Sequence, residues 1–75
     1  MNCNFKDLVE MKKEYDSKDV QDVILDLSKL YRLYYPSTIS EMTCINRNTI
    51  VAYKSGVTKP SFGNYLILLE LSKTV

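Results

Sequence analysis

Residues 20–34 carry the feature that most constrains the fold of this chain. Apolar side chains recur there at intervals of three and four residues over about four helical turns. They are Val20, Val23, Ile24, Leu27, Leu30, Tyr31 and Tyr34. This spacing puts them on one face of an α-helix, which predicts a helix buried along that face. Asp16 or Ser17 can cap its start, and Pro36 ends it because Tyr35 is driven out of the helical region.

Residues 4–15 show a partial helical period, with Phe5, Leu8 and Tyr15 on one side. Asn4 is placed to cap a helix that begins there. The pattern predicts a helix, but it also fits an arm that is only loosely docked, and the sequence leaves both alternatives open.

Residues 38–56 predict two short helices joined by a tight turn. Thr38 and Glu41 have the spacing of a capping box, which starts a helix that ends near Thr43. Three residues then turn the chain, and Asn46 is a good cap for a second helix over residues 47–54.

Gly56 and Cys44 are the positions in this region where the backbone conformation matters most. Gly56 is suited to end the second helix in that conformation. If Cys44 in the turn adopts a positive φ, the cost relative to glycine is about 1 kcal/mol. Cys44 is otherwise expected to behave as a small buried apolar residue, as free cysteines usually do.

A last helix is predicted from Ser61 to about Lys73. Its inner side is expected to hold Phe62, Tyr65, Leu66 and Leu69. Ile67, Leu68 and Leu71 make the helix apolar on a second side as well, and a helix of this kind is usually buried on more than one side. These three residues are the predicted dimer interface, with the N-terminal helix as the alternative cover.

The composition limits the class of protein. Seventy-five residues form one domain, and no apolar run reaches the roughly 20 residues that span a bilayer. No signal peptide is evident, so we expect a cytoplasmic protein without a membrane partner. The chain has two cysteines and no histidine, which excludes a Cys/His zinc site and removes the commonest general base. We therefore expect no metal, no cofactor and no enzymatic activity.

Several positions in the second half of the chain match one known pattern. Ile39, Ile45, Ile50 and Tyr53 supply the apolar seam that two helices across a tight turn must share. Gly56 and the following "KPS" at residues 59–61 precede the leucine-rich "YLILLEL". In these features residues 36–72 resemble the helix-turn-helix of the lambda-repressor-like (Xre/Cro) family. Ser40 stands where that family usually has alanine, and Cys44 where it usually has glycine.

The predicted fold is thus an all-α bundle of four to five helices that contains a lambda-repressor-like helix-turn-helix. Residues 1–75 form a single domain, with residues 1–16 as an N-terminal helix or arm and residues 17–75 as the core bundle.

The outward residues of the second motif helix suit the major groove of DNA. Arginine can bind guanine and asparagine can bind adenine through paired hydrogen bonds, while small apolar side chains meet thymine methyl groups. The predicted base contacts are Asn46, Arg47, Asn48, Val51 and Ala52. The predicted backbone contacts are Thr38, Thr49, Lys54, Ser55 and Lys59.

The formal net charge of +1 conceals an uneven distribution. Residues 1–41 hold six Lys/Arg and eight Asp/Glu, a net charge of −2, whereas residues 42–75 hold four and one, a net charge of +3. Each neutralised phosphate adds about −0.9 to the salt slope of DNA binding, so a monomer with so few cations binds weakly. We therefore predict a homodimer that reads two half-sites about 34 Å apart.

Two functions follow from this sequence. The first is a sequence-specific transcriptional regulator that binds double-stranded DNA, such as a dimeric repressor of a phage or mobile element. The alternative is a protein-binding antirepressor, or an inhibitor of a bacterial defence enzyme, on the same scaffold. Such a module would bind its protein partner through the acidic N-terminal half or the apolar last helix.

Overall fold

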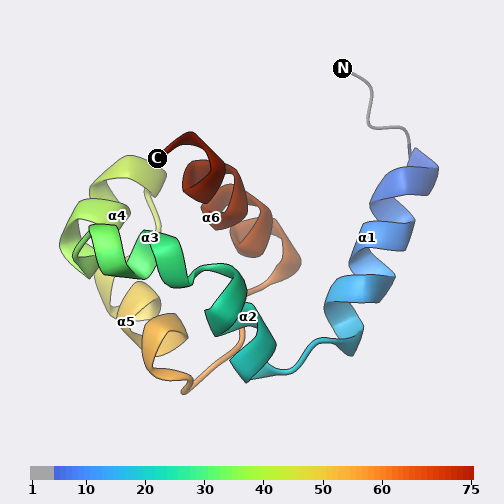
Figure 1. Ribbon diagram of the computed structural model, residues 1–75, viewed down its shortest axis with the longest axis horizontal. Coiled ribbons are helices and arrows are strands. Elements are labelled where there is room, and N and C mark those ends of the chain that lie inside the picture. Colours follow the sequence, from blue (N-terminus) through green and yellow to red (C-terminus); the bar gives the residue numbers. More distant parts are fainter. Residues whose placement is uncertain (1–4) are drawn as a thin grey trace.

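The computed structural model describes residues 5–75, which form six α-helices and no strand (Figure 1). The helices are α1 (Phe5–Ser17), α2 (Val20–Asp26), α3 (Ser28–Leu33), α4 (Pro36–Thr43), α5 (Arg47–Ser55) and α6 (Phe62–Thr74). Helices α2 to α6 form a bundle, and α1 lies at its edge. The all-helical prediction is confirmed. The suggested cap at Asn4 lies outside the described residues.

The helix predicted over residues 20–34 is divided in two, which raises the number of helices above the four to five expected. The break is at Leu27, whose φ of −105° and ψ of 8° leave the helical region. Its amide donates to the carbonyls of both Val23 and Ile24, each at 3.2 Å, and Tyr31 N donates to Leu27 O at 3.1 Å. These bonds connect α2 to α3, so buried apolar side chains of both helices face the core, and Leu27 between them is fully buried. No glycine or proline marks such a break in the sequence.

The predicted start of this segment was also wrong. Asp19, rather than Asp16 or Ser17, caps α2, and its Oδ1 accepts from Asp22 N at 2.9 Å. The reason is that α1 extends through Ser17, so both expected caps are already part of that helix.

Helix α4 begins at Pro36, two residues before the predicted cap. Proline has no amide hydrogen and a fixed φ that suits the first helical position, so Tyr35 becomes the residue that precedes the helix. Thr38 therefore lies inside the first turn, and the capping box predicted for Thr38 and Glu41 is wrong.

The connection between α4 and α5 follows the sequence closely. Gly56 has a φ of 84°, the left-handed conformation expected at the end of α5, and Cys44 is also left-handed, with a φ of 63°. Asn46 caps α5, with its Oδ1 accepting from Asn48 N at 2.8 Å. Cys44 is exposed, which corrects the expectation that it is buried, because its left-handed backbone lies in the connection itself.

The four seam residues between α4 and α5 are buried, as predicted. Ile39, Ile45, Ile50 and Tyr53 belong to one core together with residues of α2, α3 and α6. The other core residues are Tyr15, Val23, Leu27, Leu30, Tyr31, Tyr65 and Leu68. Of the predicted inner side of α6, Tyr65 is buried, and Phe62, Leu66 and Leu69 pack partly buried against the core. Burial of this seam fixes the side of α5 that remains exposed.

The C-terminal end of α1 packs against the bundle. Tyr15, its one buried residue, donates its hydroxyl to the carbonyl of Pro60. The ring centroids of Tyr15 and Tyr65 are 4.4 Å apart, and those of Tyr15 and Phe62 are 5.7 Å apart. The predicted helix is confirmed, and we call this set of contacts the α1 anchor (Tyr15, Lys59, Pro60, Phe62 and Tyr65). Among residues 5–75, no helix is long and apolar enough to cross a bilayer.

Candidate nucleic-acid interface

One side of α5 is open and carries most of the predicted base contacts. Arg47, Asn48 and Val51 are exposed, and Val51 retains 42% of its accessible surface. Lys54 and Ser55 continue the same side one turn further along the helix. We call these five residues the α5 face. They are brought together because the opposite side of the helix supplies Ile50 and Tyr53 to the core.

Three residues predicted to contact DNA are less accessible to a ligand than expected from the sequence. Thr49 and Ala52 are half-buried at the margins of the α5 face. Asn46 is exposed, but its side-chain oxygen is engaged in capping α5. Only its amide nitrogen remains for a ligand, so Asn46 is not suited to the paired contact with adenine, which needs both atoms.

The start of α4 offers backbone donors rather than a side-chain cap. The first helical bond of α4 runs from Ile39 N to Tyr35 O at 3.1 Å, so the amides of Ser37 and Thr38 precede it. No side chain caps this end of the helix. Thr38, predicted as a contact to a DNA backbone, has a half-buried side chain within this first turn, and its amide is one of the two donors.

A cationic hollow of about 300 Å³ lies between the end of α3 and the end of α5. Its lining residues are Tyr31, Arg32, Leu33, Tyr34, Tyr35 and Lys54, and none of them is acidic. Arg32 and Lys54 are separated by 22 positions in the chain, so only the fold brings them to one hollow. The sequence reasoning missed Arg32 and Tyr35, and no linear pattern connects them to α5.

Tyr31 forms part of the wall of this hollow but directs no usable polar group to it. The residue is buried, and within residues 5–75 its hydroxyl has no hydrogen-bond partner. Burial, with smaller effects from Tyr53 and Tyr15, raises the pKa of Tyr31 to about 12. The phenol therefore remains neutral at physiological pH, and the positive charge of the hollow comes from Arg32 and Lys54.

Lys59, predicted as a phosphate contact, has its ammonium group bound within its own protomer. Its Nζ donates to the carbonyls of Tyr15 at 2.8 Å and Lys18 at 2.7 Å, and it lies 4.3 Å from the Tyr15 ring centroid. These contacts hold the ammonium group at the C-terminal end of α1, where it stabilises the α1 anchor.

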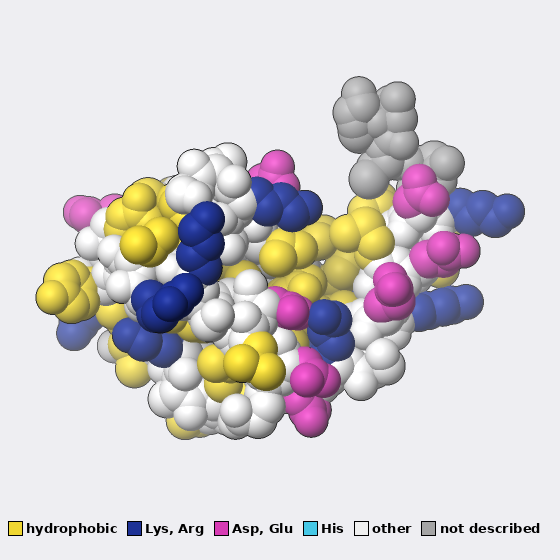
Figure 2. Space-filling view, viewed as in Figure 1, with side chains coloured by type: hydrophobic (Ala, Val, Ile, Leu, Met, Phe, Trp, Pro, Cys, Tyr) yellow, Lys and Arg dark blue, Asp and Glu magenta, His cyan; other side chains and the backbone are white. Residues whose placement is uncertain are grey.

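The charge asymmetry of the sequence has a counterpart in space. Figure 2 shows Lys and Arg side chains gathered over the part of the bundle formed by α3, α4 and α5, whereas most acidic side chains on this face lie over α1 and α2. No acidic residue occurs between Met42 and Leu69, a stretch that contains all of α5. An anionic ligand at the α5 face therefore meets no carboxylate from α5 itself.

The predicted dimer residues occupy three different environments. Ile67 is 45% exposed and Leu71 is half-buried, but Leu68 is fully buried in the core of its own protomer. Leu68 is therefore not available to a partner, and that part of the prediction is wrong. Leu68 belongs to the common core, and α6 contacts α3 in the bundle.

Comparisons with protein-family models, curated proteins and solved structures find no match to this chain. Among residues 5–75, no group of three or more Cys, Asp or Glu side chains is placed to hold a metal ion.

Proposed function

We propose that this protein is a sequence-specific DNA-binding transcriptional regulator that uses α4 and α5 as a lambda-repressor-like helix-turn-helix. The observation that carries the proposal is the open, acid-free α5 face beside the cationic hollow of Arg32 and Lys54. The sequence resemblance over residues 36–72 points to the same use of these helices. By analogy with that family, the setting is repression in a phage or mobile element.

The α5 face supplies the groups that a major groove requires. Arg47 can donate a pair of hydrogen bonds to guanine, and Asn48 can pair with adenine. Val51 offers a methyl surface to thymine. Arg47 and Asn48 stand in the first turn of α5, the part of a recognition helix that reaches the base edges.

The surrounding groups suit the phosphate backbone. Arg32 and Lys54 provide charge, and the amides of Ser37 and Thr38 provide neutral donors at the start of α4. With Arg32 in place of Lys59, the number of cations near the α5 face remains small. Tight binding therefore still requires two protomers on a palindromic site.

The decisive experiment is selection of bound DNA from a random pool, followed by binding measurements at several salt concentrations. We expect a palindrome with half-sites about one helical turn apart. Arg47→Ala and Asn48→Ala should each cost about 1–3 kcal/mol and relax the preference at one base position. Arg32→Ala should weaken binding to all sequences alike and reduce the salt slope by about 1 per protomer.

A matched control is Lys6→Ala, which removes a cation from the far end of α1 (Figure 1). It should leave both affinity and salt slope unchanged. If the pool yields no enriched sequence, or if Arg47→Ala and Asn48→Ala bind as the unaltered protein does, the proposal is overturned. The protein-binding alternative would then be the better account.

A further inference from the structure

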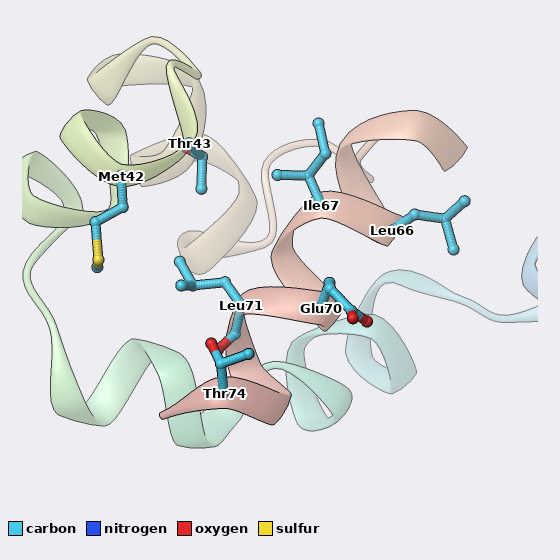
Figure 3. A pocket seen from close by; sticks show the side chains of 7 residues that line it. All are labelled: Met42, Thr43, Leu66, Ile67, Glu70, Leu71 and Thr74. Carbon is cyan, nitrogen blue, oxygen red and sulfur yellow. The ribbon is translucent and has the colours of Figure 1, made fainter. Parts of the chain in front are cut away.

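The bundle has an apolar groove between the end of α4 and α6 that no side chain of residues 5–75 of the same protomer fills. This α4–α6 groove has a volume of about 470 Å³. It is lined by Met42, Thr43, Leu66, Ile67, Glu70, Leu71 and Thr74 (Figure 3). Figure 3 shows the side chains from the end of α4 on one side and those of α6 on the other. Glu70 is its only charged residue.

Helix α1 has an apolar side that its own protomer leaves largely uncovered. Phe5 is 80% exposed, and Leu8 and Met11 are also exposed. Phe5, Leu8 and Val9 stand at positions i, i+3 and i+4, the spacing with which a helix places its anchors in a groove. A hollow of about 290 Å³ follows this side and is lined by Phe5, Leu8, Val9, Lys12, Lys13 and Phe62.

We infer that α1 of one copy docks in the α4–α6 groove of a second copy, and that the second copy returns the same contact. The charges at the two surfaces are opposite. Glu70 forms no ion pair within residues 5–75, and Lys13 beside the α1 hollow forms none either. In the docked dimer, the carboxylate of Glu70 from one copy and the ammonium group of Lys13 from the other lie beside the same apolar contact.

The protomer's own α1 does not fill this groove. The α1 anchor holds the helix at the start of α6, and Phe62 is the only α6 residue that lines the hollow beside α1. The groove begins a turn later, at Leu66, and continues to Thr74. A second copy can present its α1 there, and exposed Ile67 of the groove can then enter the hollow of the incoming helix.

Reciprocal docking gives a closed dimer with two-fold symmetry. Each copy contributes one helix and one groove, so the same pair of surfaces is buried twice and nothing remains open for further growth. None of the residues of the α5 face lines the groove or the hollow. The arrangement deepens the homodimer of the proposed function, but its formation does not depend on DNA.

Sedimentation equilibrium without DNA tests this inference. We expect a concentration-dependent dimer, and Leu8→Glu or Ile67→Glu should raise its dissociation constant by about 30-fold or more, as loss of a central anchor does. Both side chains are exposed in the protomer, so the variants should fold, which circular dichroism checks. Leu25→Glu is the matched control, since Leu25 is exposed and lines neither surface; it should leave the dissociation constant unchanged.

Charge reversal tests the relative placement of the two surfaces. Lys13→Glu and Glu70→Lys should each weaken the dimer by roughly threefold, and the double variant should restore it. A protein that stays monomeric at several hundred micromolar overturns the inference, as does a dimer that tolerates both Leu8→Glu and Ile67→Glu or gains nothing in the double variant.

These experiments distinguish failure of the docking inference from failure of the proposed function. A monomer that still selects a DNA sequence overturns the docking alone. A dimer with the expected variant behaviour that selects no DNA overturns the proposed function alone.

Discussion

The α4–α5 pair and α1 are both helical, but they are held in place by different means. Ile39 and Ile50 of the pair are fully buried and pack into the common core. In α1, Tyr15 is the one buried residue. The pair is therefore fixed by burial along its length, whereas α1 is fixed at one end. This difference explains why the α5 face is defined by the bundle and why the apolar side of α1 remains available to another chain.

The largest effect is expected from a cavity in the α4–α5 seam. Ile50→Ala should lower the free energy of unfolding by about 2–5 kcal/mol, because a fully buried side chain is removed from a packed core. Its neighbour provides the control: Val51→Ala, on the exposed side of the same helix, should change it by no more than about 0.5 kcal/mol. Urea denaturation monitored by circular dichroism measures both, and equal effects would contradict the assigned faces of α5.

A smaller effect is expected at the α1 anchor. Tyr15→Phe keeps the ring but removes the hydrogen bond to the Pro60 carbonyl, which should cost about 1–2 kcal/mol. Amide hydrogen exchange should accelerate along α1 while the amides of Ile39 and Ile50 stay protected. Uniform acceleration across the chain would instead show that α1 and the bundle unfold as one unit.

The opposite behaviour is expected for Tyr31, another buried tyrosine. Tyr31→Phe removes a hydroxyl that has no partner within residues 5–75, so stability at pH 7 should be unchanged or rise by up to about 1 kcal/mol. Comparing the free energies of unfolding of Tyr31→Phe and Tyr15→Phe in urea isolates the contribution of the hydrogen bond from Tyr15 to Pro60. A loss for Tyr31→Phe as large as that for Tyr15→Phe would show that the Tyr31 hydroxyl is satisfied in solution.

The same two tyrosines predict a loss of stability at alkaline pH. Burial raises the pKa of Tyr15 and of Tyr31 to about 12, from an ordinary value near 10. The folded state therefore holds these protons more tightly than the unfolded chain, and this contribution is complete below pH 10 and lost as the pH rises from about 10 to 12. Raised pKa values of Tyr65, chiefly through burial, and Lys18, chiefly through its hydrogen bond to Asp26, act in the same direction.

Denaturation midpoints from pH 8 to pH 11 measure this dependence. The midpoint should fall above about pH 10, and Tyr31→Phe should make the fall shallower because one of the titrating groups is gone. A midpoint that is constant up to pH 11 would mean that these phenols are solvated.

The smallest effect is expected in the connection between α4 and α5. Cys44→Gly relieves a left-handed backbone at φ 63° but makes the unfolded chain more flexible. The two effects nearly offset each other, so we expect a net gain of about 0.5 kcal/mol or less in a urea titration. Gly56→Ala is the converse test, since it imposes a side chain at φ 84° and should cost about 1 kcal/mol.

Local chemistry in the sequence was sufficient to locate much of the fold. The spacing of Ile39, Ile45, Ile50 and Tyr53 predicted the buried seam, and Asn46 and Gly56 predicted the ends of α5. Each of these features depends on residues within one short helix or at its end. Helical periods and the caps of α5 could therefore be predicted from local sequence, whereas the caps of α2 and α4 depended on where the neighbouring helix ended or proline began the helix.

Other features were decided only when distant segments packed together. Leu68 was predicted to face a partner but is buried in the core of its own protomer. Lys59 was predicted to contact phosphate, but its ammonium group donates to the carbonyls of Tyr15 in α1 and of Lys18 just after it. Arg32 joined Lys54 at one hollow only because the end of α3 lies beside the end of α5. Burial and ion placement depend on which elements become neighbours, and no local pattern specifies that. The sequence by itself thus determined which segments are helical and which residues form the α5 face. The tertiary structure decided the break at Leu27, which cations accompany that face and which apolar side chains remain for a partner.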